Sequence, residues 1–271
     1  MVDTEQFPTY SVLIPTVGRN SLLLAVNSVI NQTFPPLEIL IVAHAGALNK
    51  SIQETLTSFD NIRIKTIPKG NAAVTRNAGI LEAQGEYIAF IDDDDIWTPK
   101  KIEVQFSKST SPVISCRAQY VGWSNQIRPE ILFTKNFLSS VYSDWLPRKR
   151  KTIISMSSLL IKNELAKRIM FDETLSERED LWFIHQVESE GEKIVQIDDV
   201  LVTYASRKPL AIRKVSLQSD IDWFNRLQAI RQGLGWNFIL GVALRNRVFS
   251  LDLLGAAYLL FLAVVSPFRY H

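Results

Sequence analysis

Four consecutive carboxylates, Asp92 to Asp95, are the residues of this sequence that most directly indicate chemistry. They follow the apolar run 87–91, which is typical of a buried strand in a parallel sheet. Carboxylates held this closely repel one another unless a cation lies among them. A divalent metal ion that carries a phosphate meets this need. The run therefore predicts a metal site at the carboxyl end of a strand, where open α/β sheets bind ligands, with a solvated acidic turn as the alternative.

The residues after the acidic run predict that a helix begins there. Thr98 is a favoured N-cap residue, and Pro99 fits the first helical position. Trp97 is placed to pack on Ile102 across the first turn. A calcium-binding EF-hand loop needs glycine at its sixth position, where this sequence has Trp97. The acidic run is therefore interpreted as a loop between a strand and a helix, and not as an EF-hand.

Further charged positions with chemical potential lie elsewhere in the chain. Glu179 and Asp180 begin the predicted helix 179–188, where acidic residues favour the helix dipole. A carboxylate here that reaches a hydroxyl group would instead act as a general base. Arg76, in the predicted helix 72–83, either binds phosphate, orients the acidic loop or forms a surface ion pair. The residues alone leave these alternatives open.

The elements that would position these groups alternate regularly in the first part of the chain. Strands are predicted at 10–15, 37–43, 62–67 and 87–91, and helices at 22–30, 51–59 and 72–83. Such alternation is typical of an α/β fold with a mostly parallel central sheet flanked by helices. Beyond residue 107 the alternation loosens. The elements predicted there are strands at 112–120, 131–133 and 194–197, an apolar stretch at 153–161, and helices at 163–168, 179–188 and 220–231.

Composition and charge limit the functional classes. The 271 residues are 46% hydrophobic and carry a net charge of +2, which argues against a general nucleic-acid binder. After residue 200 there are nine basic and three acidic residues, a bias that favours an anionic ligand or surface. Cys116 is the single cysteine, so an intrachain disulfide is excluded. With a polar N-terminus that shows no apolar leader, this predicts a cytoplasmic protein.

The C-terminal part is predicted to be a helical, apolar tail. Its apolar runs 236–244 and 253–265 are separated by Arg245-Asn246-Arg247, and the second run falls short of the roughly 20 residues that span a bilayer. The tail is interpreted either as core helices or as an element on a membrane surface. We expect three regions, with bounds 1–110, 111–215 and, for the tail, 216–271.

The order of several motifs resembles the family-2 glycosyltransferases, which have the GT-A fold. The likeness covers roughly residues 10 to 205, and the segments that carry it are 11–16, 31–33, 38–42, 70–80, 85–95, 171–173 and 179–182. The resemblance implies an enzyme that moves a sugar from a nucleotide diphosphate sugar to an acceptor hydroxyl, with inversion. It also implies a place in polysaccharide or glycoconjugate synthesis, with a glycan, a lipid-linked sugar or a protein as the acceptor.

The resemblance implies that region 1–110 is the nucleotide-sugar-binding half and that region 111–215 is the acceptor-binding and catalytic half of the same domain. It also assigns roles to individual residues. It implies Asp180 as the catalytic base and a Mn²⁺ or Mg²⁺ ion on Asp94, with Asp92 and Asp95 as further candidate ligands. It places nucleotide-sugar contacts at Pro15, Thr16, Arg19, His44, Arg76, Asp92, Asp93 and Arg207. Two positions depart from the family pattern. His44 stands where acids usually read the base, and Arg207 or Lys208 is expected to replace a basic residue that the family has beside the diphosphate.

Two other functions compete with glycosyl transfer. A haloacid dehalogenase-type phosphohydrolase also has an Asp-x-Asp motif after an apolar strand, and Asp198-Asp199 would supply its later acidic pair. Against it, Ile96 occupies the place where that class has Thr or Val. A catalytically silent sugar-nucleotide-binding partner protein is the second alternative, and His44 is its main support. We expect a cytoplasmic protein that is peripheral on the inner face of a membrane, with no nucleic-acid partner.

Overall fold

The chain forms two compact units in a computed structural model. The model describes residues 7–121, 125–142, 153–205, 216–230 and 252–265, together with residues 235, 238, 239 and 243. The first unit comprises residues 1–135 and 152–207, and the second comprises residues 136–151 and 208–271. Each unit is described by itself. The predicted boundaries after residues 110 and 215 stay predictions.

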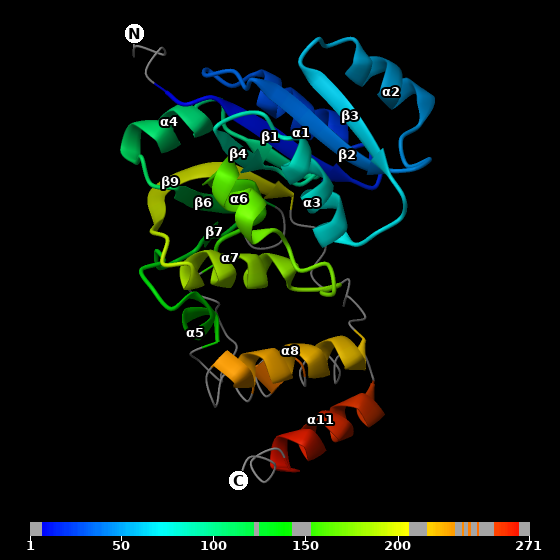
Figure 1. The fold of residues 1–271 in the computed structure, drawn as a ribbon, viewed down its shortest axis with the longest axis vertical. Helices are drawn as coiled ribbons and strands as arrows, with labels where there is room; N and C mark the ends of the chain where they lie inside the picture. The colour runs from blue at the N-terminus through cyan, green and yellow to red at the C-terminus, as the bar shows by residue number, and fades with distance from the viewer. Residues whose placement is uncertain are drawn as a thin grey trace. The chain divides into compact units, whose positions relative to one another are not determined.

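The first half of the large unit is a parallel sheet. Its strands are β1 (Tyr10–Thr16), β2 (Glu38–His44), β3 (Ile62–Ile67) and β4 (Tyr87–Phe90), and its helices are α1 (Leu22–Ile30), α2 (Lys50–Thr57) and α3 (Ala72–Glu82). The pairs β1–β2, β1–β4 and β2–β3 are all parallel (Figure 1). Both faces of β1 and β2 are covered, which explains their nearly continuous apolar sequences. The predicted alternation of strands and helices is confirmed.

The second half extends the same sheet in the order β3-β2-β1-β4-β8-β6-β9-β5. Its strands are β5 (Asp95–Trp97), β6 (Val113–Val121), β7 (Ile127–Arg128), β8 (Leu160–Lys162) and β9 (Ile194–Ala205). Strand β8 runs antiparallel to β4 and β6, whereas β9 is parallel to β6 and antiparallel to β5. The helices of this half are α4 (Lys101–Lys108), α6 (Asn163–Ile169) and α7 (Glu179–Ser189), with a 3₁₀ turn, η2, at Met156–Ser158. The prediction of a mostly parallel sheet flanked by helices is thereby confirmed.

Two local predictions in this half are wrong. Helix α4 begins at Lys101 and Thr98 is not its cap, because the backbone before it pairs with β9 as strand β5. The Gln32 side chain joins these backbone groups instead: its Nε2 donates to the Thr98 carbonyl (2.7 Å) and its Oε1 accepts from the Ile102 N–H (3.3 Å). Residues 131–133 do not form a strand.

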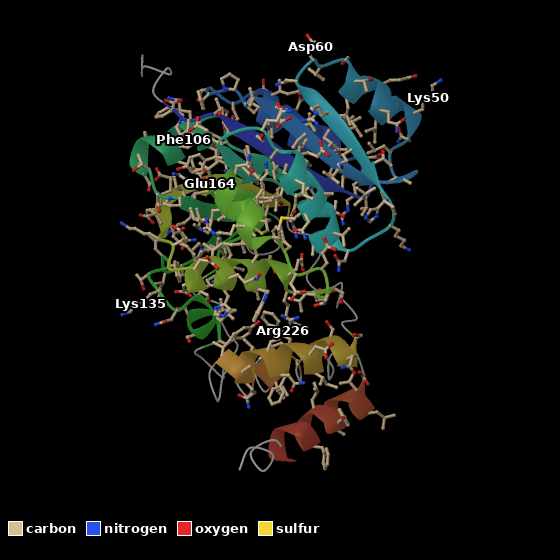
Figure 2. All side chains as sticks on the ribbon, viewed as in Figure 1. Lys50, Asp60, Phe106, Lys135, Glu164 and Arg226 are labelled. Carbon is tan, nitrogen blue, oxygen red and sulfur yellow. The ribbon has the colours of Figure 1, made fainter. Side chains whose placement is uncertain are left out.

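Helix α3 packs closely on the sheet. A Cβ atom at Gly79 would lie 2.6 Å from Leu13 Cγ, so only glycine allows this approach. The core beneath the helices includes an aromatic cluster in which Phe106 contacts Tyr10, Phe34 and Tyr87 at centroid distances of 5.2–6.4 Å. The side chains between the sheet and its helices can be followed in Figure 2. This packing fixes α3 as a rigid element beside the carboxyl ends of β1 and β2.

The second unit is helical in the part that the structure describes. It contains α5 (Phe137–Val141), α8 (Leu217–Ile230) and α11 (Leu253–Val265). The indole Nε1 of buried Trp223 on α8 donates to the Tyr142 hydroxyl oxygen (3.1 Å), and the Tyr142 ring contacts Phe238. Among the described residues, no helix is both long enough and apolar enough to span a bilayer.

Candidate active site

The predicted site residues gather where parallel strands end. Thr16 closes β1, His44 closes β2, and Asp92 follows β4 by two residues. Because carboxyl ends of parallel strands meet at one edge, these side chains share one side of the sheet. Pro15, also in β1, is half-buried beside them. Arg207 lies outside the residues that the structure describes.

Asp93 is the buried anchor of the acidic run. Its Oδ2 accepts from Thr16 Oγ1 (2.5 Å), and its Oδ1 pairs with Arg19 Nη1 (2.6 Å). The same Arg19 nitrogen lies 3.8 Å from Asp94 Oδ2. Gly18 adopts φ +81° and donates its N–H to Thr16 Oγ1 (2.9 Å), and a Cβ there would collide with a neighbouring backbone carbonyl. The loop after β1 therefore holds the acidic run in place.

Arg76 joins the acidic run to α7. Its Nη2 lies 3.0 Å from Asp92 Oδ1, its Nη1 lies 2.7 Å from Glu179 Oε1, and its side chain is only 7% exposed. The guanidinium also lies over the Phe171 ring at 5.4 Å, and its Nε has no hydrogen-bond partner. Burial opposes the charge, but Asp92, Glu179 and Asp180 outweigh it and raise the pKa of Arg76. Of the predicted roles for Arg76, this geometry corresponds to orienting the acidic loop.

Asp95 differs from its neighbours in the run. It lies in β5, is buried, and accepts a hydrogen bond from Ser157 Oγ (2.5 Å). Ser157 Oγ in turn accepts from the Asp92 N–H (2.9 Å). Burial, followed by the charge of Asp92, raises the pKa of Asp95 to about 8. The side chains of Asp92 and Asp94 are 36% and 24% exposed, so these two carboxylates are the more accessible of the run.

Glu179 and Asp180 form the first turn of α7, and the residue before them, Arg178, has a positive φ of 64°. Glu179 is held by Arg76, and burial and the Asp180 charge raise its pKa. Asp180 Oδ1 accepts from the Leu181 N–H (2.8 Å), and its side chain is half-buried. The charge of Asp180 acts on both Arg76 and Glu179, which places it within the same electrostatic cluster.

His44 contacts residues at the start of α3. Its Nε2 lies 3.3 Å from Thr75 Oγ1 and 3.4 Å from the Gly70 N–H nitrogen. The imidazole is half-buried at the end of β2, where the family pattern has acids. The edge of the sheet at β2 therefore presents an imidazole in place of a carboxylate.

Three positioning residues were missed by the sequence reasoning. Asn71 caps α3 through the Val74 N–H (3.0 Å) and donates to the carbonyls of Glu173 (2.8 Å) and Leu175 (3.2 Å). Asn77 exchanges two hydrogen bonds with the Phe171 backbone, at 2.9 and 2.7 Å. Ser157 bridges Asp92 and Asp95. The asparagines lie in the 70–80 motif, but only the fold reveals the segment 171–175 as their partner.

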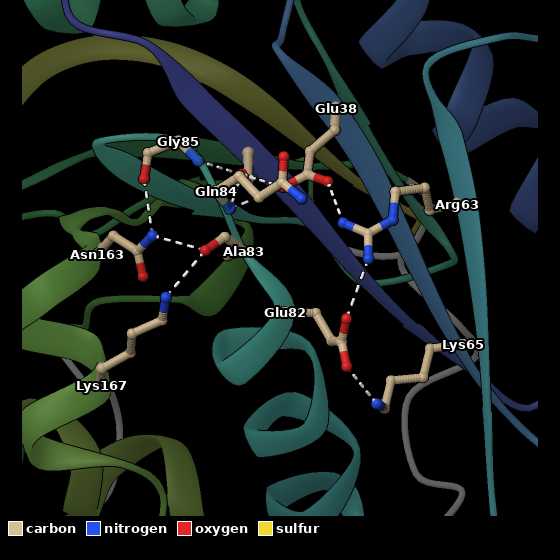
Figure 3. Close-up of polar contacts among 10 residues, drawn as sticks. Glu38, Arg63, Lys65, Glu82, Ala83, Gln84, Gly85, Asn163 and Lys167 are labelled. Carbon is tan, nitrogen blue, oxygen red and sulfur yellow. Dashed lines mark hydrogen bonds and ion pairs between the residues drawn. The ribbon is translucent and has the colours of Figure 1, made fainter.

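The opposite end of α3 is fixed by a second polar network, shown in Figure 3. Asn163 Nδ2 donates to the carbonyls of Ala83 (2.9 Å) and Gly85 (2.7 Å), and Lys167 Nζ also donates to the Ala83 carbonyl (2.9 Å). Glu82 pairs with Lys65 (2.5 Å) and Arg63 (3.0 Å). The bonds from Asn163 and Lys167 satisfy backbone carbonyl groups at the end of α3 and just after it, which would otherwise lack partners.

The donor set suits a hard divalent cation that shares its shell with a ligand. In the described part of the chain, no group of three or more His, Cys, Asp or Glu side chains is arranged as a complete metal site. Mg²⁺ is commonly held by one or two carboxylates while substrate phosphates and water complete its coordination. Asp92 and Asp94 offer two partly exposed carboxylates of this kind.

A mostly parallel sheet with an acidic loop after a central strand and an acidic pair on a nearby helix is the arrangement of GT-A-type glycosyltransferases. The chain belongs to glycosyl transferase family 2, whose model matches residues 11–161. The fold is similar to that of S. aureus TarS residues 1–349 in complex with UDP-GlcNAc. The TM-score is 0.60 with 18% identity, and the match covers 89% of this chain and 73% of that one.

Proteins of similar sequence are also named as glycosyltransferases. A candidate colanic acid biosynthesis glycosyl transferase of Escherichia coli K12, WcaA, is 37% identical over 101 residues, 36% of each chain. An E. coli protein named UDP-Glc:alpha-D-GlcNAc-diphosphoundecaprenol beta-1,3-glucosyltransferase, WfgD, is 32% identical over 102 residues, 36% of this chain and 39% of WfgD. The matches span 27–58% of the length of the first three curated relatives.

Proposed function

We propose that this protein transfers a sugar from a nucleotide diphosphate sugar to an acceptor hydroxyl in the synthesis of a polysaccharide or glycoconjugate. The observation that carries this proposal is the Arg76 bridge. It holds the acidic run, where a diphosphate would bind, against the turn that bears Asp180. One site thereby combines carboxylates that would hold a cation for the diphosphate with a carboxylate able to accept a proton. Family membership and the TarS fold support the same reaction.

The roles of the residues follow from this arrangement. Asp180 would remove the proton of the acceptor hydroxyl, and attack opposite the leaving diphosphate would invert the anomeric carbon. Asp92 and Asp94 would hold Mn²⁺ or Mg²⁺, which supplies positive charge against the charge that develops on the leaving diphosphate. Asp93 and Arg19 keep the loop in register. Asp95 orients the backbone through Ser157, so we propose it as a supporting residue rather than a metal ligand.

The donor and the acceptor are proposed by class. TarS is described in complex with UDP-GlcNAc, and the name of WfgD gives UDP-glucose and a diphosphoundecaprenol-linked sugar. We therefore propose uridine as the first base to test and a glycan or lipid-linked acceptor. His44 at the end of β2 would face the base. We place the reaction in the cytoplasm, at the inner face of a membrane.

The phosphohydrolase alternative gains no support from the acidic pair it needs. Asp198 pairs with Arg117 (2.8 Å) and Asp199 pairs with Lys108 (2.5 Å), so both are engaged as ion pairs along β9. A turnover assay distinguishes glycosyl transfer from donor binding without catalysis. The purified chain is incubated with UDP-sugars and Mn²⁺, and release of UDP with and without a lipid-linked acceptor is measured. Acceptor-dependent release supports glycosyl transfer, whereas donor binding without release would identify a silent binding protein.

A further inference from the structure

Helix α11 exposes most of the large apolar side chains among residues 253–261, the part of the helix whose side chains the structure describes. Leu254, Tyr258 and Phe261 are 87%, 45% and 57% exposed, and their spacing of four and three residues places them on one face of the helix. Leu253 and Leu260 flank this face at 65% and 43% exposure. Within residues 253–261 the buried positions are Gly255, Ala256 and Leu259, two of which are among the smallest residues. We call the five exposed side chains the apolar face of α11.

A surface helix of an ordinary globular protein has the reverse pattern, with large apolar residues inward and polar residues outward. Between its first and last residue, α11 contains no charged side chain. Contiguous exposed apolar side chains of this size mark a surface that another apolar phase covers. The helix has 13 residues and is about 20 Å long, shorter than the roughly 30 Å hydrocarbon core of a bilayer. Its length suits the helix to lie in the headgroup region of a bilayer and not to cross the bilayer.

The net charge of the second unit favours an anionic partner. Residues 136–151 and 208–271 contain twelve Lys or Arg against four Asp or Glu, a net charge of +8, whereas the rest of the chain has eighteen against twenty-four, a net charge of −6. A second copy would bring together two units that each carry a net charge of +8, and this charge opposes their association. An anionic lipid surface attracts such a unit and accepts apolar side chains at the depth of its headgroups.

We infer that the apolar face of α11 docks on an anionic membrane surface, with Leu254, Tyr258 and Phe261 inserted at the headgroup level. This deepens the proposed function, because it rests on the proposed location at a membrane and names the surface that binds there. Tyr258 suits this depth, because its ring is apolar and its hydroxyl reaches water. Docking would bring the catalytic unit to a membrane that holds a lipid-linked acceptor.

Flotation of the full chain with lipid vesicles tests the inference. Vesicles of phosphatidylcholine with phosphatidylglycerol should carry the protein upward, vesicles of phosphatidylcholine alone should carry much less, and 1 M NaCl should weaken the first result. The variant Leu254→Glu/Phe261→Glu should lose about tenfold or more in partitioning for each inserted side chain removed. The control Leu24→Glu/Leu81→Glu changes side chains that are 59% and 65% exposed in the other unit, and it should float like the wild type.

Other outcomes would overturn the inference. Equal flotation of the α11 variant and the wild type would show that another surface binds lipid. A wild type that fails to float but sediments as a dimer, with the α11 variant monomeric, would assign the face to self-association. Thermal melting confirms that the variants fold, which is expected because the changed side chains are exposed. UDP-sugar turnover with a soluble acceptor is measured in parallel, so failure of docking is distinguished from failure of the proposed catalysis.

Discussion

The two ends of the large sheet carry polar clusters of opposite character. At the amino end, Glu38 and Glu82 face Arg63 and Lys65, so that two acids meet two bases; we call this the scaffold cluster. At the carboxyl end, six carboxylates, Asp92 to Asp95 with Glu179 and Asp180, share two arginines, Arg19 and Arg76, among the described contacts. We call this the acidic cluster. The first is a closed network, and the second has an excess of negative charge.

This difference indicates a structural role for the scaffold cluster and favours ligand binding at the acidic cluster. Balanced pairs at a partly exposed edge need nothing further, and each contributes modestly to folding. Unbalanced carboxylates held by rigid elements repel one another, and the cation that we propose at this site would offset that repulsion. The contrast predicts that equivalent substitutions will act on stability at one end and on function at the other.

The largest effect is expected from Asp180→Asn. The amide keeps the size of the side chain but cannot accept a proton, so turnover should fall by ~10²–10⁴-fold. Donor affinity, measured by calorimetry, should stay within about twofold, because the base does not hold the nucleotide. Glu82→Gln in the scaffold cluster is the matched control and should leave turnover unchanged. Near wild-type turnover in Asp180→Asn would show that the base lies elsewhere.

Arg76→Met should be the most destabilising of the paired substitutions. It leaves Asp92 and Glu179 without their buried partner, and loss of one member of a buried ion pair costs about 3–5 kcal/mol. The matched substitution in the scaffold cluster, Lys65→Met, breaks a pair with Glu82 in which the two side chains are 39% and 36% exposed, and it should cost about 0–1 kcal/mol. Urea unfolding of both variants measures the two free energies, and equal losses would contradict the contrast between the clusters.

Lys101 sharpens the comparison because it is a buried cation whose described contacts are uncharged. Its Nζ donates to Gln105 Oε1 (2.7 Å) and lies 4.1 Å from the Trp97 ring centre, and burial lowers its pKa from 10.5 to about 8. The folded state therefore binds fewer protons than the unfolded state between pH 8 and 10.5. Stability should rise with pH across this window, by about 3 kcal/mol at most. Lys101→Met should remove that rise in the difference between two urea-unfolding series.

The smallest effect is expected from Asp94→Ala, which should change binding and leave folding intact. Asp94 is partly exposed, so its loss removes little packing, but donor affinity in the presence of Mn²⁺ should fall about tenfold, an estimate based on the charge of one carboxylate ligand. Titration calorimetry with Mn²⁺ and with a chelator measures the difference. Equal donor affinity of the wild type under both conditions would contradict the metal role.

Local patterns predicted the acidic run and the parallel half of the sheet, whereas the role of Asp180 was implied only by the resemblance to the family. Apolar runs bounded by turns specify buried strands wherever they occur in a chain. The bridge from Arg76 to Glu179 spans 103 residues, and the bond from Ser157 to Asp95 spans 62. No local pattern encodes such partners, so the orientation of Arg76 and the burial of Asp95 required the fold.

The predicted helix start at Thr98 failed for the same reason. The residue types were correct for a cap, but residues 202–204 of β9, more than a hundred positions further along, take the backbone of residues 95–97 into the sheet. Pairing with a distant strand overrode the local preference. His44 shows the converse case: its position at the end of β2 was predictable, whereas its contacts with Thr75 and Gly70 were not.

Strand β5 also determines when the site can exist during synthesis of the chain. Asp95 pairs with Tyr204, and Trp97 pairs with Val202, so the strand that ends the acidic run has no partner until residue 204 has been made. Closing so long a loop is slow compared with forming the local β1–α1–β2 contacts. A nascent chain therefore builds its parallel half first and completes the acidic loop last. A ribosome-bound fragment that ends before β9 should fold its first three strands yet lack a finished catalytic loop.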